Sequence, residues 1–185
     1  MGLNDPGKPV LTGPDVRLRP LAASDADAVI AGMNDAESMR LTGSHGTFTP
    51  KQVAAHCARV AAASDRWDYA IEVPDAFGPR MLGEAVLNEV DPGNRSANIR
   101  IAIWVPEARN RGYGTEAMRL LTGFGIRQVG LHRIELHVHA FNPRAIRAYE
   151  KVGFRLEGTL REALLWDGAR IDTHVMAVLA SDWPA

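Results

Sequence analysis

Residues 99–117 read Ile99-Arg-Ile-Ala-Ile-Trp-Val-Pro-Glu-Ala-Arg-Asn-Arg-Gly-Tyr-Gly-Thr-Glu-Ala117, and they hold the most informative pattern in the sequence. Apolar residues alternate up to Val105, which predicts a strand that ends there. From Thr115 to Val129 they recur at helical spacing, and Gly130 is a helix stop signal. The stretch therefore predicts a strand, a short glycine-containing loop and a long helix.

The loop carries the pattern Arg109-x-x-Gly112-x-Gly114 at the start of the helix. A helix start presents unpaired backbone N–H groups and the positive end of the helix dipole. Glycines let the backbone approach an anion without an intervening side chain. Because Arg109 and Arg111 add positive charge, the loop has the chemistry of a pyrophosphate-binding site.

Two other interpretations of this loop are open on local grounds. A helix start with glycines for tight turning and arginines for solubility needs no ligand. The spacing Gly112-x-Gly114-x-x-Ala117 also satisfies the dinucleotide-binding fingerprint, with Glu135 at a suitable distance downstream. Against a dinucleotide-binding fold, several residues separate Val105 from Gly112, and the first half of the chain lacks the βαβ alternation. A P-loop is excluded because no Gly-Lys-Ser/Thr follows the glycines.

A second motif lies downstream, where Asn142 precedes a helix that ends in Tyr149-x-Lys151-x-Gly153-Phe154. The two motifs together resemble the GNAT superfamily of acetyl-CoA-dependent N-acetyltransferases. Two further stretches resemble the branch that contains the ribosomal-protein N-terminal acetyltransferases of RimJ/RimL type: Arg17-Leu18-Arg19-Pro20-Leu21, and Glu157 to Glu162 followed by Asp167-Gly168, Asp172 and Met176. The resemblance covers nearly the whole chain after its first 14 residues.

The order of predicted elements indicates an α+β fold. Strands are expected at 16–21, 67–73, 80–90, 94–105, 133–140, 154–165 and 170–179, and helices at 25–33, 35–41, 50–64, 115–129 and 143–152. The strand–helix–strand unit at 99–140 requires one parallel crossover. We therefore expect the GNAT fold, with a mixed, mostly antiparallel sheet of about seven strands and helices on both faces. Residues 1–14 are expected to form a flexible arm and residues 15–185 a single domain.

The resemblance also implies roles for particular residues. Acetyl-CoA would be bound by Ile103, Trp104, Val105, Arg109, Asn110, Arg111, Gly112, Tyr113, Gly114, Thr115 and Asn142. A bulge in the strand near Ile103 would splay it from the next strand and free backbone groups for the pantetheine amides. Tyr149 would be the general acid that protonates the leaving thiolate, although an aromatic packing role is also open, as is plain helix capping for Asn142. The general base stays open among Glu84, Glu89, Glu135, His137 and His139.

Composition narrows the classes of partner. The formal net charge of −1 gives no overall attraction to nucleic acid or to an anionic membrane, and no stretch approaches the roughly 18 apolar residues of a membrane span. Cys57 is the only cysteine, so no intramolecular disulfide or thiolate zinc site is expected, which fits the cytoplasm. No metal is expected, and the amine acceptor is not readable. A homodimer is one option for the assembly. A non-catalytic acyl-CoA-binding regulatory module and a dinucleotide-dependent oxidoreductase are the alternatives to an enzyme that acetylates amines.

Overall fold

The computed structural model describes residues 2–76 and 78–184. Eight strands form one sheet in the order β1-β2-β3-β4-β5-β6-β8-β7. Their bounds are β1 Leu11–Thr12, β2 Arg17–Pro20, β3 Trp67–Val73, β4 Arg80–Asp91, β5 Ser96–Ile103, β6 Arg133–His139, β7 Arg155–Trp166 and β8 Ala169–Leu179. The neighbours β5 and β6 are parallel and the other neighbouring pairs are antiparallel, which confirms the expected mixed α+β sheet with one parallel crossover.

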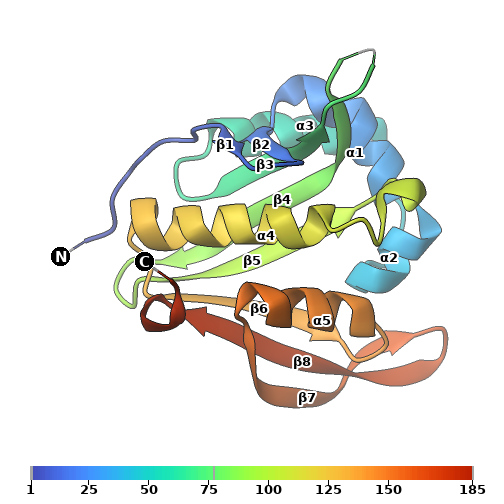
Figure 1. Cartoon of the computed structure of the whole chain (residues 1–185). Coiled ribbons are helices and arrows are strands. Elements are labelled where there is room, and N and C mark those ends of the chain that lie inside the picture. The colour runs from blue at the N-terminus through green and yellow to red at the C-terminus, as the bar shows by residue number, and fades with distance from the viewer. Residues whose placement is uncertain (1, 77, 185) are drawn as a thin grey trace.

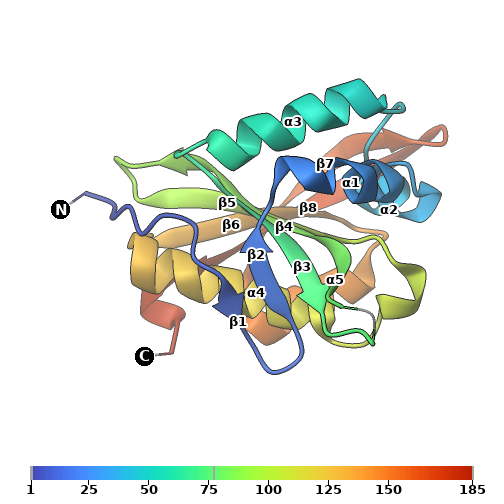
Figure 2. The same cartoon turned by 90° about the horizontal axis from the view of Figure 1, so that it is seen from above.

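Helices cover both faces of the sheet, as expected (Figures 1 and 2). Figure 2 shows α1, α2 and α3 on one face and α4 and α5 on the other. The helices are α1 Ala26–Met33, α2 Ala36–Thr42, α3 Pro50–Ala62, α4 Tyr113–Phe124 and α5 Pro143–Val152, and α4 continues into a π-helical turn at Gly125–Val129. No helix in the described part of the chain is both long and apolar enough to cross a membrane.

The helix starts follow from local side-chain chemistry. Thr49 caps α3 by accepting a hydrogen bond from the Gln52 amide, and the Gln52 side chain accepts one from the Thr49 amide in return. Asp35 caps α2 by accepting from the Ser38 amide at 2.8 Å. Gly153 ends α5 at φ +114°, a left-handed conformation that favours glycine.

Two apolar clusters hold the helices to the sheet. The larger cluster packs α4 and α5 on one face through residues such as Met118, Leu121 and Phe124. The smaller cluster packs α1 and α3 on the other face and contains Cys57 and Trp104. Both clusters remove apolar surface from water, which is the main favourable term in folding.

The N-terminal arm, expected to be flexible, lies against the domain. The Asn4 amide donates to the Val129 carbonyl at 2.9 Å, and the Trp67 indole N–H donates to the Gly7 carbonyl at 2.8 Å. The arm also contains β1, the eighth strand, which pairs with β2 and buries Leu11. A two-residue strand has no readable alternation, so the sequence did not predict it.

Candidate active site

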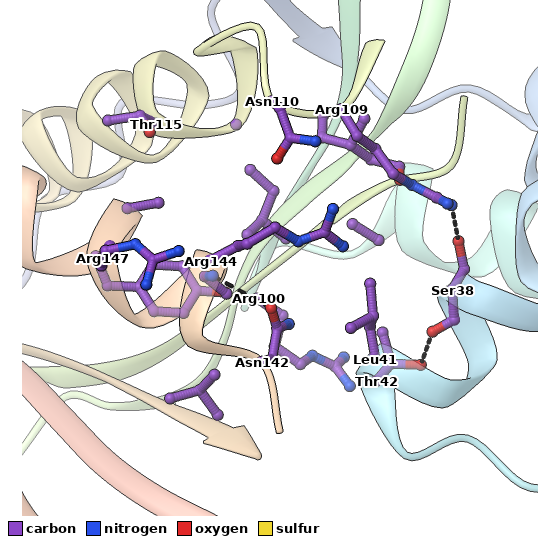
Figure 3. A pocket seen from close by; sticks show the side chains of 18 of the residues that line it. Ser38, Leu41, Thr42, Arg100, Arg109, Asn110, Thr115, Asn142, Arg144 and Arg147 are labelled. Atoms are coloured by element: carbon purple, nitrogen blue, oxygen red, sulfur yellow. Dashed lines mark hydrogen bonds between the residues drawn. The ribbon is translucent and has the colours of Figure 1, made fainter. Parts of the chain in front are cut away.

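The parallel strands β5 and β6 separate along their length. They pair only at Ser96–Asn98, opposite Arg133, Ile134 and Glu135. Beyond these pairs a cavity of about 460 Å³ opens between β5 and β6. The loop before α4, the helix α5 and the helix α2 supply its other walls (Figure 3).

Backbone groups of β5 face this gap. The Trp104 amide donates to the Leu82 carbonyl of β4 at 2.9 Å, so by strand alternation the backbone groups of Ile99, Ile101 and Ile103 point the other way, towards β6. The Val105 amide also points to the Leu82 carbonyl, at 3.5 Å. Two successive amides on one carbonyl make a bulge directly after β5, where the strands separate.

The loop before α4 is shaped to receive an anion. Asn110 and Gly112 have positive φ values of 65° and 91°, and α4 begins at Tyr113 with no side chain capping its first turn. The first N–H groups of α4 therefore have no intrahelical partner. A Cβ added at Gly112 would meet nothing within 4 Å, so the loop is open there.

The Arg109 side chain makes its contacts inside the protein rather than at the outer edge of the loop. Its guanidinium donates to the carbonyls of Ile103 and Trp104, both at 3.0 Å, and forms a 2.6 Å ion pair with Asp35. It also donates to the Ser38 hydroxyl at 3.0 Å (Figure 3). Burial raises the pKa of Asp35, but hydrogen bonds from Arg109 and Ser38 outweigh this effect and leave that pKa below its ordinary value. Arg109 thereby ties the loop to the N-terminus of α2.

The helix α5 supplies the opposite wall. The Asn142 side-chain oxygen accepts from the Ala145 amide at 3.2 Å, so the capping role considered for Asn142 is present, and the residue also lines the cavity. Arg144, Arg147 and Lys151 line the cavity from the same helix. This wall therefore combines positive charge with an amide side chain.

Tyr149 lines the cavity one turn before the end of α5. Its ring packs against Phe154 with ring centroids 6.2 Å apart, and its hydroxyl has no hydrogen-bond partner among the described residues. Desolvation by burial raises the pKa of the Tyr149 hydroxyl to about 12. The hydroxyl therefore stays protonated and can donate a hydrogen bond into the cavity.

The cavity gathers most of the residues expected to bind acetyl-CoA, but not all of them. Its lining includes Ile103, Arg109, Asn110, Gly112, Gly114, Thr115 and Asn142, together with the expected catalytic residue Tyr149. Trp104, Val105, Arg111 and Tyr113 lie outside that lining. The Trp104 ring packs over Gly32 of α1 in the smaller cluster, and its backbone amide is already bonded to β4.

The residues expected to bind acetyl-CoA did not include those that line the cavity beside α2. Ser38, Leu41 and Thr42 of α2 lie opposite Thr115 and Arg147 across the cavity (Figure 3). Arg100, Ala102, His137 and His139 line this part from β5 and β6. We call these seven residues the acceptor half of the cavity. Ser38 and Arg100 belong to neither sequence motif. They come to the cavity only because the fold brings α2 to the open end of β5.

The five candidate bases differ in their surroundings. Glu84, Glu89 and Glu135 do not line the cavity, and Glu135 accepts hydrogen bonds from Arg133. The His139 ring bonds the Thr173 hydroxyl at 3.0 Å and the backbone of Thr42. Burial lowers the pKa of His139 despite the Thr42 contact. His137 lines the cavity, and its ring has no hydrogen-bond partner in the part of the chain that is described.

The two histidines on β6 do not belong to a larger cluster of metal-binding side chains. Within residues 2–76 and 78–184, no group of three or more His, Cys, Asp or Glu side chains is placed to hold a metal ion.

Comparisons of the sequence and of the structure with known proteins identify the same family. The family described as the acetyltransferase (GNAT) domain matches residues 15–155. A spermidine N(1)-acetyltransferase of Vibrio cholerae is 32% identical over 103 residues, which is 56% of this chain and 59% of the length of that relative. An uncharacterized N-acetyltransferase of Bacillus subtilis, YoaA, is 27% identical over 176 residues, covering 92% of this chain and 97% of the relative.

Solved structures agree with these sequence matches. A spermidine N-acetyltransferase of Vibrio cholerae, solved in complex with CoA and spermine, has a TM-score of 0.81 at 25% identity and covers 91% of this chain and 97% of its own. A GCN5-related N-acetyltransferase of Brucella melitensis has a TM-score of 0.78 at 28% identity, covering 100% of this chain and 84% of its own. The chain therefore belongs to the GNAT family of acetyltransferases.

Proposed function

We propose that this protein transfers an acetyl group from acetyl-CoA to a primary amine by direct attack in a ternary complex. The observation that carries the proposal is the gap between β5 and β6, with the uncapped start of α4 at one side. The pantetheine arm would bind along β5 through Ile99, Ile101 and the Ile103 amide, because Arg109 already occupies the Ile103 carbonyl. The diphosphate would lie at the α4 N-terminus, where unpaired amides and the helix dipole favour negative charge.

The bond changes are those of acyl transfer. The neutral amine nitrogen attacks the thioester carbonyl carbon, the C–S bond breaks, and the CoA sulfur leaves as a thiolate. Tyr149 would donate a hydrogen bond to that sulfur and supply its proton as negative charge develops, and the tyrosinate would then be reprotonated from solvent. A second group must accept the proton that the amine loses.

His137 is the group that we propose for this second role. It lies in the acceptor half of the cavity, and its ring is not engaged by other residues of the described chain. We expect His137→Gln to lower kcat/KM for the amine by about 10²-fold, the lower end of the range for general acid–base catalysis. The loss should be largest at neutral pH and shrink at high pH, where more of the amine is neutral in solution. Initial rates from pH 6 to 10 would measure this effect.

The control for this prediction is His132→Gln. His132 is exposed and does not line the cavity. It should keep the wild-type pH profile. A His137→Gln profile that superimposes on the wild type would remove His137 from the mechanism.

A covalent route through cysteine is disfavoured by the position of Cys57. Cys57 is 0% exposed within α3 and does not line the cavity, and burial raises the pKa of its thiol above the ordinary value. We therefore expect intersecting double-reciprocal plots, as in a sequential mechanism, and an active Cys57→Ala variant. Parallel lines, or acetylation of Cys57 when the enzyme meets acetyl-CoA alone, would contradict direct attack.

The identity of the acceptor is a further level of proposal. The sequence resemblance points to protein N-termini, and the named relatives point to polyamines. We keep the cytoplasm as the proposed compartment, because the single thiol is buried and needs no oxidising environment. A homodimer remains a prediction.

A further inference from the structure

The polar side chains of the acceptor half are mostly committed to partners inside the protein. Ser38 bonds Asp35 and receives a hydrogen bond from Arg109. Thr42 donates to the Ser38 carbonyl at 2.8 Å. His139 is held by the two contacts described above. Among the polar residues of the acceptor half, Arg100 and His137 are the two whose side chains have no hydrogen bond or ion pair within the described chain.

Arg100 faces away from the phosphate-binding side. Strand alternation directs the side chains of Arg100 and Ala102 to the same face of β5, and Ala102 packs with the cluster under α1 and α3. The charge of Arg100 is felt on this same face of the sheet: it contributes to lowering the pKa of His56 in α3 and opposes the rise in the pKa of Glu84 in β4. The CoA phosphates would lie on the opposite face, at α4 and α5. Arg100 is therefore a cation on the acceptor side that the phosphates do not use.

No carboxylate among the described residues lines the cavity to balance the positive charge of its arginines. None of the described residues that line it is Asp or Glu. Four acidic residues outside the lining are paired with arginines: Asp35 with Arg109, Glu37 with Arg40, Asp68 with Arg66, and Glu135 with Arg133.

Glu84 is the remaining acid near Arg100. It has no ion pair among the described residues and does not line the cavity. Burial raises the pKa of Glu84, and the charge of Arg100 opposes that rise without an ion pair between the two side chains among the described residues.

We infer that Arg100 binds a carboxylate of the acceptor, so that the substrate is a small amine that itself carries a carboxylate, as an amino acid does, and not a polyamine. The planar guanidinium matches a carboxylate in a bidentate geometry. A polyamine would bring a second ammonium group into a cavity lined by arginines and without a carboxylate to receive it. This inference rests on the proposed function, because it names the acceptor of the same site.

The test compares matched acceptors. Each L-amino acid of a panel is assayed beside its α-amide, which keeps the side chain and the amine but removes the carboxylate, and spermidine is assayed in parallel. Thiol release from acetyl-CoA gives kcat/KM for wild type, Arg100→Gln, Arg100→Lys and the control Arg170→Gln. Arg170 is exposed in the β7–β8 hairpin and does not line the cavity.

We expect Arg100→Gln to lower kcat/KM for the preferred amino acid by about 10- to 100-fold, the range for a hydrogen bond between charged groups. Its effect on the matching amide should be less than about twofold, and Arg100→Lys should recover part of the loss. Comparing variants on one acceptor removes the difference in amine pKa between acid and amide. Acetyl-CoA affinity and the Arg170→Gln variant should match the wild type.

Two results would overturn the inference: efficient turnover of spermidine by the wild type, or an equal loss on acid and amide in Arg100→Gln. Calorimetric binding of the same acceptors to the CoA complex separates the inference from the proposed function. Binding of the amino acid that depends on Arg100, without turnover, would uphold the acceptor class and reject the transferase. Turnover of the amide at the rate of the acid would uphold the transferase and reject an acceptor that is recognised by its carboxylate.

Discussion

Tyr149→Phe is expected to lower kcat by about 10²–10⁴-fold, the loss typical when a general acid is removed. The change deletes one hydroxyl from a residue that lines the cavity and keeps the ring that packs against Phe154. Stability and acetyl-CoA affinity should therefore stay close to wild type. Because the pKa of the Tyr149 hydroxyl is raised to about 12, the proton donor should remain protonated throughout the usable pH range. The wild-type kcat should show no fall attributable to Tyr149 below about pH 11.

The matched control is Tyr69→Phe. Tyr69 is fully buried in the larger cluster, and its hydroxyl has no hydrogen-bond partner in the described structure. Its removal takes away a tyrosine hydroxyl outside the cavity and should leave kcat unchanged. A folded Tyr149→Phe enzyme with wild-type kcat, under conditions where chemistry limits the rate, would assign Tyr149 to packing alone.

Gly114→Val is expected to weaken acetyl-CoA binding by about 100-fold or more, which corresponds to losing one or two hydrogen bonds to charged phosphate oxygens. A Cβ added at Gly114 would lie 3.6 Å from Ile103 and 3.8 Å from Ile101, both ordinary contacts. The valine therefore fits the protein, but it takes space on the cavity wall at the first turn of α4. Calorimetric titration with acetyl-CoA measures the loss.

The melting temperature of Gly114→Val should not fall, because valine has a higher helix propensity than glycine. Gly158→Val in β7 is the control, since a Cβ there would meet nothing within 4 Å and the residue lies outside the cavity. Unchanged acetyl-CoA affinity in folded Gly114→Val would exclude this turn of α4 from the binding site.

The parts of the fold that the sequence predicted well are those with strong local signals. Thr49-Pro50 and Asn142-Pro143 marked two helix starts, and Gly153 marked a helix end, because capping chemistry is local. The parallel crossover followed from the strand–helix–strand order alone. The docked arm and β1 were not predicted, since their contacts reach residues far along the chain, such as Trp67 and Val129.

The directions of side chains within the site could not be predicted for the same reason, because they depend on contacts with residues far away along the chain. A motif names a residue but does not say which way its side chain points. Arg109 belongs to the phosphate-loop motif, yet its guanidinium turns inwards to Asp35, which lies 74 positions earlier. Trp104 follows the cofactor strand, yet its ring faces α1. Arg100 and Ser38 carry no motif, and only their arrangement around the cavity indicates a role.

Acetyl transfer to an amine is tested most directly by measuring the products that the wild-type protein forms. The enzyme is incubated with acetyl-CoA and a panel of amines that contains amino acids, their amides and spermidine, and products are quantified by mass spectrometry alongside free CoA thiol. We predict that one amine class gains one acetyl group for each thiol released, and that Tyr149→Phe slows both signals equally. Acetyl-CoA binding with no acetylated amine would instead indicate a regulatory module, and binding of NAD(H) in place of acetyl-CoA would contradict the account altogether.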